Sequence, residues 1–247
     1  MSNKVLPVSA DKGSSESRAR VAFNASVSGI PDVPPSAAAT TLSGKIGFNR
    51  RFRGLNRRDA VSLNLETKVE TRLSSGSEEE SNLFVRLSPD GTKVVFRSNN
   101  SLVIADADGK NPLTVPNVTY PEVPNWSPDS QHIVFASERL YMIDANGQNK
   151  RRISWNRPST AIASVFSNPT WSPDGSKIFY AFGVPTGETY INAYDVAVLT
   201  LARNQDGTFI TNPDGSIAIT SDVQITSGLN PLWPALSPDG SKIAFYK

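Results

Sequence analysis

Few residues in this chain have the types and spacing that catalysis requires. Its 247 residues include a single histidine, His132, and no cysteine, which excludes thiolate nucleophiles, disulfides and thiolate zinc sites. A general base needs a nucleophile and an orienting group beside it. No Gly-x-Ser-x-Gly segment, the kind that presents a nucleophilic serine, occurs in the sequence. We therefore expect no catalytic residue and no enzymatic activity in this chain.

Aspartate recurs in one fixed context. The tetrapeptide Ser-Pro-Asp-Gly or a close variant occurs four times, at Ser88–Gly91, Ser127–Ser130, Ser172–Gly175 and Ser237–Gly240. Four acids separated by whole repeats cannot converge on one substrate atom. Proline fixes φ at the second position, and aspartate accepts hydrogen bonds from neighbouring backbone amides. We interpret the four segments as structural turns.

Two further candidates for chemistry have simpler structural explanations. His132 occupies the repeat position that holds lysine in the other copies, which predicts a solvent-facing strand position. The segments Asp106–Gly109, Asp144–Gly147 and Asn204–Gly207 resemble the opening of a calcium loop but lack its remaining ligands. The first two segments stand where a hairpin turn is required, and turn chemistry is sufficient to explain them. We expect no metal and no cofactor, with calcium as the alternative.

The repeats indicate the elements that surround these residues. A Lys-Ile-x-Phe-like strand begins at residues 45, 93, 132, 177 and 242, at spacings of 48, 39, 45 and 65. Four-stranded propeller blades repeat about every 40–50 residues. We predict an all-β fold, a β-propeller of four-stranded antiparallel blades, with four blades and the start of a fifth cut short at Lys247. The longest interval predicts an extra hairpin at Phe209–Ile219.

Prolines indicate which strand lies innermost. Pro124, Pro169 and Pro234 each stand two residues before the bulky apolar residue that precedes the Ser-Pro-Asp turn. Proline cannot donate to a strand ladder and is confined to edges, strand beginnings and bulges. These strands are therefore predicted to be blade edges that face a central channel.

The repeat unit resembles that of the TolB-like β-propellers. The resemblance rests on Pro-x-Trp-Ser-Pro-Asp-Gly-x-Lys-Ile units, as in Pro169–Tyr180, followed by an Asp-x-Asp/Asn-Gly turn, and it covers roughly residues 45–247. The first unit departs from it, because it lacks Ser-Pro-Asp-Gly. The resemblance implies a periplasmic or extracellular protein, a partner-binding propeller of the Tol–Pal kind, or a propeller attached to a prolyl-oligopeptidase-like or tricorn-like peptidase.

Composition bounds the remaining choices. Residues 1–40 are rich in Ser, Ala and Pro without periodicity, which predicts a disordered leader before the propeller at 41–247. The net charge of +2 does not indicate nucleic-acid binding. The sequence contains no signal peptide and no run of about 20 apolar residues. We expect no membrane insertion.

The best candidate for binding lies away from the repeated turns. We letter the four strands of a blade A to D in chain order. An up-and-down blade places its A–B and C–D turns on one face, the turn face, and its irregular loops on the other, the loop face. Irregular loops on a rigid framework usually carry binding. The predicted irregular loops are Asn49–Arg58, Gly76–Asn82, Val115–Glu122, Trp155–Phe166 and Gly183–Thr189. The first contains five arginines around an aromatic residue, a combination that suits carboxylates or an acidic peptide.

We predict a non-catalytic propeller that binds a protein or peptide partner on this face. The predicted contacts are Arg50, Arg51, Phe52, Arg53, Arg57, Arg58, Tyr120 and Trp155. The alternative for the arginines is a solvated loop neutralised by Glu78–Glu80. Two alternative functions stay open: the substrate-gating propeller of a peptidase whose catalytic domain is missing from this chain, and a saccharide-binding propeller.

Overall fold

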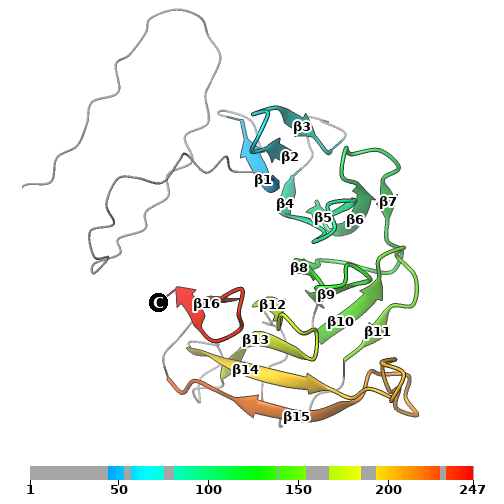
Figure 1. Cartoon of the computed structure of the whole chain (residues 1–247), viewed down its shortest axis with the longest axis vertical. Coiled ribbons are helices and arrows are strands. Elements are labelled where there is room, and N and C mark those ends of the chain that lie inside the picture. The colour runs from blue at the N-terminus through cyan, green and yellow to red at the C-terminus, as the bar shows by residue number, and fades with distance from the viewer. Residues whose placement is uncertain are drawn as a thin grey trace, which may run out of the picture. The chain divides into compact units, whose positions relative to one another are not determined.

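The computed structural model describes residues 44–52, 57–74, 81–137, 139–153, 167–184, 193–228 and 232–246. They belong to one compact unit, Thr41–Lys247, and every regular element among them is a β-strand (Figure 1). Within this part of the chain, no helix is available to cross a membrane. The predicted leader at 1–40 lies outside the described residues.

Three sheets have the complete four-stranded antiparallel blade. Their strands follow in chain order as β4 (Asn82–Leu87), β5 (Lys93–Ser98), β6 (Ser101–Asp106) and β7 (Leu113–Thr114); β8 (Glu122–Trp126), β9 (His132–Ser137), β10 (Arg139–Asp144) and β11 (Arg151–Arg152); and β12 (Ser167–Trp171), β13 (Lys177–Val184), β14 (Ala193–Leu201) and β15 (Ile219–Gln224).

Two smaller sheets stand before and after these three. They comprise β1 (Lys45–Arg51), β2 (Arg58–Asn64) and β3 (Glu70–Arg72), and β16 (Leu232–Leu236) with β17 (Ile243–Tyr246). Among the described residues, which begin at Gly44, no strand precedes β1 in the first sheet, and β1 contacts β4 directly. The last sheet holds the first two strands of a further blade. The predicted all-β propeller architecture is confirmed, including the degenerate first unit.

The first strands of successive blades lie side by side. Strand β4 contacts β8, β8 contacts β12, and β12 contacts β16, as Figure 1 also shows. Each of these strands is an edge of its own sheet. This confirms the edge position that the prolines predicted for β8, β12 and β16.

Burial on both faces explains why the second strands are continuously apolar. On β5, Val94 and Phe96 pack into a core with Ala60 and Leu73 of the preceding sheet. Val95 points the other way, into a core with the following sheet. Successive side chains of a strand alternate between faces, so a strand between two neighbouring sheets must be apolar on both.

The Ser-Pro-Asp turns close through one repeated hydrogen-bond set. In the third complete blade, Ser172 Oγ donates to Asp174 Oδ1 at 2.5 Å and accepts from Lys177 N at 2.9 Å, while Ser176 N donates to Asp174 Oδ1 at 3.1 Å. The same bonds recur around Asp90, Asp129 and Asp239. The carboxylates of these aspartates therefore accept hydrogen bonds within their own turns, as the structural interpretation predicted.

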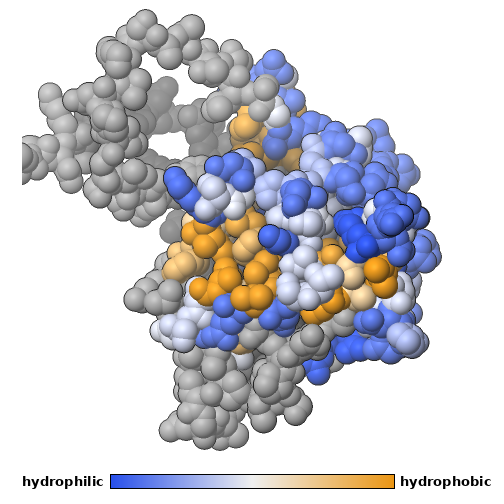
Figure 2. All heavy atoms as spheres, turned by 60° about the horizontal axis from the view of Figure 1, so that its bottom comes forward, coloured by the Kyte–Doolittle hydropathy of each residue, from blue (hydrophilic) through white to orange (hydrophobic). Residues whose placement is uncertain are grey.

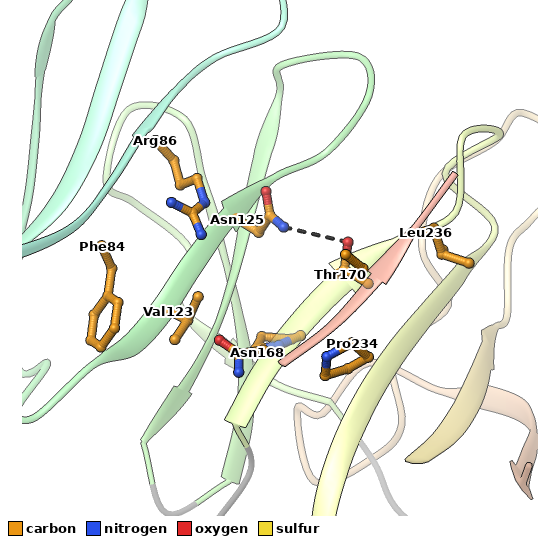
Figure 3. A pocket seen from close by; sticks show the side chains of 10 residues that line it. Phe84, Arg86, Val123, Asn125, Asn168, Thr170, Pro234 and Leu236 are labelled. Carbon is orange, nitrogen blue, oxygen red and sulfur yellow. Dashed lines mark hydrogen bonds between the residues drawn. The ribbon is translucent and has the colours of Figure 1, made fainter. Parts of the chain in front are cut away.

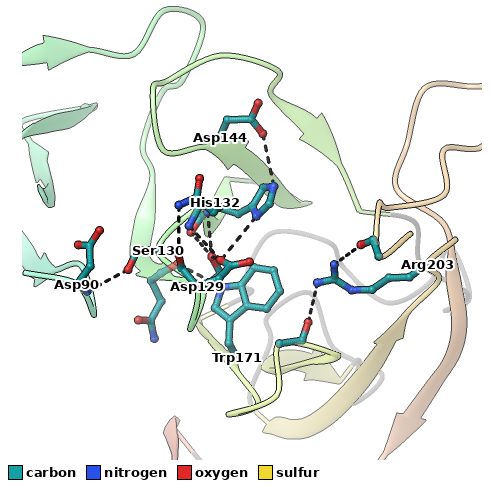
Figure 4. Close-up of polar contacts among 12 residues, drawn as sticks. Asp90, Asp129, Ser130, His132, Asp144, Trp171 and Arg203 are labelled. Atoms are coloured by element: carbon teal, nitrogen blue, oxygen red, sulfur yellow. Dashed lines mark hydrogen bonds and ion pairs between the residues drawn. The ribbon is translucent and has the colours of Figure 1, made fainter. Parts of the chain in front are cut away.

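One turn carries serine where the others carry glycine. Ser130 has a φ of 61°, in the left-handed region that Gly91, Gly175 and Gly240 occupy in the other copies. Its side chain has a use, because Ser130 Oγ accepts a hydrogen bond from Asp90 N at 3.1 Å. The bond joins the turns of two neighbouring blades (Figure 4).

The insertion occupies the turn between β14 and β15, at residues 202–218. The predicted hairpin at Phe209–Ile219 is only partly right, because isolated bridges replace its two strands. Two tight turns form instead, with Asp206 accepting from Thr208 N and Asp214 accepting from Ser216 N, each at 2.9 Å. Short polar side chains that bond their own backbone favour turns over a strand ladder.

The third complete blade also presents exposed apolar residues at its outer strand. Val223 and Ile225, on and just after β15, are 52% and 43% exposed. Figure 2 shows apolar residues among polar ones on the side where β14 and β15 lie. Exposed apolar residues are normal on soluble proteins, and we assign no site to this side.

We expect Asp174→Asn to destabilise the fold in a pH-dependent way. Hydrogen bonds from the Ser172 hydroxyl and from Ser176 lower the pKa of Asp174 from 3.8 to about 2. Its charged form therefore stabilises the fold above about pH 4, and that stabilisation is lost as pH falls through about 2. The loss at pH 7 should be about 1 kcal/mol, since the turn is solvent-exposed.

Urea unfolding at pH 7, 4 and 3 measures this effect. The difference between wild type and Asp174→Asn should shrink as the pH falls. Ser172→Ala removes the hydroxyl that bonds the carboxylate, so the double variant should lose less stability than the sum of the single variants. A difference that is the same at all three pH values would contradict the assignment.

Candidate functional site

A cavity of about 430 Å³ lies between the first strands of four successive sheets. Its volume is in the range of ligand-binding pockets. Figure 3 shows its side chains projecting from β4, β8, β12 and β16. The lining residues are Phe84, Arg86, Val123, Asn125, Asn168, Pro169, Thr170, Pro234, Ala235 and Leu236.

The lining comes mostly from two repeat positions. One is the residue directly before the bulky apolar residue that ends each first strand, and the other lies two residues earlier. The first position holds Arg86, Asn125, Thr170 and Ala235, and the second holds Phe84, Val123 and Asn168. None of these residues was among the predicted contacts. Comparing the variable residues at fixed repeat positions would have found the site.

A β-bulge in every first strand shapes the cavity. The register shifts between Leu83 and Arg86, and the same shift recurs in β8, β12 and β16. Two residues of each first strand thus face one residue of its neighbour, which bends the strand and redirects its side chains. Pro124, Pro169 and Pro234 stand inside these bulges, where proline loses no ladder bond.

The bulges hold strained backbone. Phe84, Val123 and Asn168 have φ values of 56°, 37° and 63°. Asparagine tolerates this region, whereas a bulky or β-branched residue there is a conformational outlier. Such strain costs about 1–3 kcal/mol per residue and gathers at functional sites. The strain at Phe84 and Val123 is therefore a second feature, independent of the cavity's shape, that is typical of a functional site.

Arg86 is the one ionisable residue among the described residues that line the cavity. Its Nη1 donates to the Val85 carbonyl oxygen at 3.1 Å, and no ion pair joins it to a carboxylate of the described residues. Although its side chain is open to the cavity, the surrounding strands desolvate the guanidinium and lower the pKa of Arg86. A guanidinium nevertheless stays protonated in proteins at neutral pH. Among the described residues, the lining therefore carries one positive charge and no carboxylate.

Amide and hydroxyl groups complete the polar lining. Asn125 Nδ2 donates to Thr170 Oγ1 over 3.5 Å, a long bond. Asn168 is 7% exposed, and its Nδ2 is buried without a hydrogen-bond partner in the described part of the chain. Leaving a buried donor unsatisfied costs about 1–3 kcal/mol. Together with Arg86, these groups make the cavity rich in donors.

The loop-face arginines have divided roles. Arg50 pairs with Glu70. Arg57 donates to both carboxylate oxygens of Asp59, at 2.7 and 2.9 Å, and its guanidinium lies over the Phe52 ring at 4.7 Å. Asp59 is 1% exposed and also receives Arg72 at 2.8 Å. The hydrogen bond from Arg57 is the main reason that the pKa of Asp59 is lowered. Arg57 therefore has a structural task.

Arg51 and Arg58 are the described arginines of this segment that are best placed to bind an acidic partner. They belong to strands β1 and β2, so the predicted loop at Asn49–Arg58 is shorter than its stated bounds. They stand directly opposite each other in the register. Like charges directly opposite on a sheet destabilise it. Arg53, Trp155 and the acidic run Glu78–Glu80 lie outside the described residues.

Tyr120 is prominent on the loop between two blades. Its ring is 61% exposed, and the Arg97 guanidinium lies 5.8 Å from the ring centroid. The Tyr120 backbone N–H donates to the Asn100 carbonyl oxygen at 2.8 Å, which holds the residue in place. An exposed aromatic on an anchored backbone suits recognition.

His132 is less exposed than its repeat position predicted. Its ring meets Phe209 of the insertion edge-on, with centroids 5.1 Å apart, and burial lowers the pKa of His132. Asp129 and Asp144 lie 4.0 and 3.8 Å from its ring nitrogens (Figure 4). The insertion, which other blades lack, explains the difference. No group of three or more potential ligands for a metal ion occurs among the described residues.

We expect Asp59→Ala to lower the free energy of unfolding by about 2–3 kcal/mol, because it leaves Arg57 without its buried partner. Glu70→Ala removes the partner of Arg50 from an exposed pair in the same blade and should cost under about 1 kcal/mol. Chemical denaturation of both variants measures the contrast. Equal losses would show that the Asp59 network has no special structural role.

Comparisons with known proteins agree with this architecture. No family model matches the chain. An uncharacterized peptidase, YuxL, of Bacillus subtilis is 31% identical over 145 residues, which cover 49% of this chain and 21% of that protein. The chain thus spans about a fifth of this relative's length.

Solved structures give the clearest agreement. The structure of a putative TolB from Agrobacterium tumefaciens superposes with a TM-score of 0.54 at 15% identity, covering 82% of this chain and 71% of that one. TolB from Acinetobacter baumannii covers 81% of this chain and 57% of its own at 17% identity, with a TM-score of 0.38, too low to support an argument by itself. The repeated blades and the first of these superpositions identify this chain as a TolB-like β-propeller in fold.

Proposed function

We propose that this propeller is a non-catalytic module that binds a protein or peptide partner on its loop face, with a segment of the partner entering the cavity between the first strands. The cavity is the observation that carries the proposal. It is about 430 Å³ in volume and is bounded by four edge strands, each of which has a bulge at the equivalent position. A peptide segment suits such a space, because it offers both backbone polar groups and side chains.

The charge on the loop face supports an acidic partner. Arg51 and Arg58 face each other across the β1–β2 pair, and an acidic group between them would relieve their repulsion. Arg51 is exposed and Arg58 is half-buried. Tyr120 adds exposed aromatic surface to the same face. A peptide with acidic and apolar residues would use both features.

The absence of catalysis is part of the proposal. Its support is that the recurrent serines and aspartates bond one another inside the turns, which accounts for the residues most suggestive of chemistry. A periplasmic or extracellular location also belongs to the proposal, and it rests on the family resemblance.

A second candidate function is the propeller of a larger peptidase. The similarity to the Bacillus subtilis protein whose name calls it a peptidase favours this candidate. Expressing the gene's complete reading frame and assaying the product for peptidase activity would decide it. Hydrolysis of short peptides by the full-length product, lost on changing a serine outside the propeller, would support this candidate over the first.

Charge reversal on the loop face tests the first proposal. We expect an immobilised wild-type protein to enrich acidic members of a phage-displayed library of random dodecapeptides. Arg51→Glu with Arg58→Glu should reduce retention of the enriched peptides at least tenfold. The control is Lys45→Glu with Lys242→Glu, which makes the same change in net charge at two exposed residues of the turn face.

Circular dichroism would establish that both double variants fold. Retention that falls equally in the two would show that only net charge matters. Failure to enrich any peptide would contradict the proposed function.

A further inference from the structure

The cavity between the first strands has a more specific chemistry than peptide binding in general. Nine of its ten lining residues cannot ionise, and the tenth is Arg86. Its guanidinium bonds the Val85 carbonyl oxygen through Nη1, which leaves further N–H groups of its donor fork for another acceptor. An anion in the cavity would meet no carboxylate in the lining.

The strand that carries Arg86 is fixed at this residue. Trp126 Nε1 of the next blade donates to the Arg86 carbonyl oxygen at 3.0 Å, and Trp126 itself is 4% exposed. The guanidinium is therefore presented from an anchored backbone. A cation on an anchored strand loses less conformational freedom on binding than one on a loop.

The neutral polar groups of the cavity favour the same kind of ligand. Asn168 Nδ2 is a buried donor without a partner in the described structure. Asn125 Nδ2 makes only the long bond to Thr170 Oγ1, and Figure 3 shows both amides on neighbouring first strands. An ionised carboxylate is an acceptor only. It would therefore satisfy donors that water or a neutral amide would satisfy less well.

The apolar part of the lining suits an apolar side chain next to the ligand's carboxylate. Phe84, Val123 and Leu236 share the cavity with the prolines Pro169 and Pro234. An apolar side chain next to the carboxylate would cover these surfaces and exclude water. Low local polarity in turn strengthens the contact between guanidinium and carboxylate.

We infer that the cavity is a carboxylate-recognition site, in which Arg86 with Asn125 and Asn168 binds the carboxylate of a peptide whose apolar residue packs against Phe84 and Leu236. This inference rests on the proposed function and adds the chemical group recognised. The carboxylate can belong to the peptide's C-terminus or to an acidic side chain, and both present the same acceptor oxygens.

Three synthetic peptides distinguish these sources. They are an acetylated pentapeptide ending in leucine as the free acid, the same peptide as the C-terminal amide, and that amide with one internal glutamate beside the leucine. Binding is followed by calorimetry or by amide chemical shifts of the labelled full chain. We expect the free acid or the glutamate peptide to bind roughly 10- to 100-fold more tightly than the neutral amide, and the tighter of the two identifies the source.

Variants of the cavity assign the effect to its residues. Arg86→Gln should weaken binding of the preferred carboxylate peptide roughly 10- to 100-fold and leave the neutral amide nearly unchanged. Asn125→Asp places a negative charge in the cavity and should have the same selective effect. Lys242→Gln, with its charge lost from the turn face, is the matched control and should bind as wild type does. Thermal melting would establish that all three fold.

Each remaining outcome overturns the inference. If the neutral amide binds as tightly as the acids, or Arg86→Gln weakens all three peptides equally, carboxylate recognition is wrong while peptide binding by the propeller stands. If none of the three peptides binds, the cavity is not such a site. The loop-face experiment, which uses other residues and a random library, then decides the proposed function separately.

Discussion

The arrangement around the cavity depends on how two of the first strands, β8 and β12, are each fixed to the first strand of the preceding blade. Trp126 and Trp171 are buried, and their indole N–H groups donate to the carbonyl oxygens of Arg86 and Asn125 on the preceding first strands, at 3.0 and 3.4 Å. Edge strands cannot be joined by a ladder where a bulge and a proline interrupt them. The indoles supply the connection instead, so the residues directly before them keep a fixed place around the cavity.

The same geometry explains why strain and variability occur together at the cavity. The bulge bends each first strand and sets Phe84 and Val123 in a backbone region that such residues rarely adopt. Core packing of the second strands, as at Val94 and Val95, holds the blades against that cost. The lining positions are then free to differ from blade to blade, since their residues lie outside the three hydrophobic clusters of the described core. One framework can thus carry a cationic, amide or apolar lining.

Repetition also misleads where one copy differs from the rest. His132 shares its repeat position with lysines, yet the insertion after β14 places Phe209 against its ring. The Arg57 side chain looked available in the sequence, but the buried Asp59 takes up its donors. Phe209 lies in a distant segment, whereas Asp59 is only two residues from Arg57. In both cases the repeat gives no indication of the contact. An averaged repeat therefore predicts the framework better than the exceptions.

The sequence by itself determined the all-β class, the blade pattern, the turns and the edge position of the proline-bearing strands, because these follow from local rules: alternation, turn chemistry and the missing proline donor. Only the tertiary structure decided that Arg86, Asn125 and Asn168 share one cavity and that Arg57 is taken up by Asp59. Arg57 and Asp59 are only two residues apart, and it is the burial of Asp59 that makes their pairing structural. The cavity contacts, in contrast, join residues about one blade apart. They depend on the bulges and on the angle between neighbouring sheets, which no single repeat encodes.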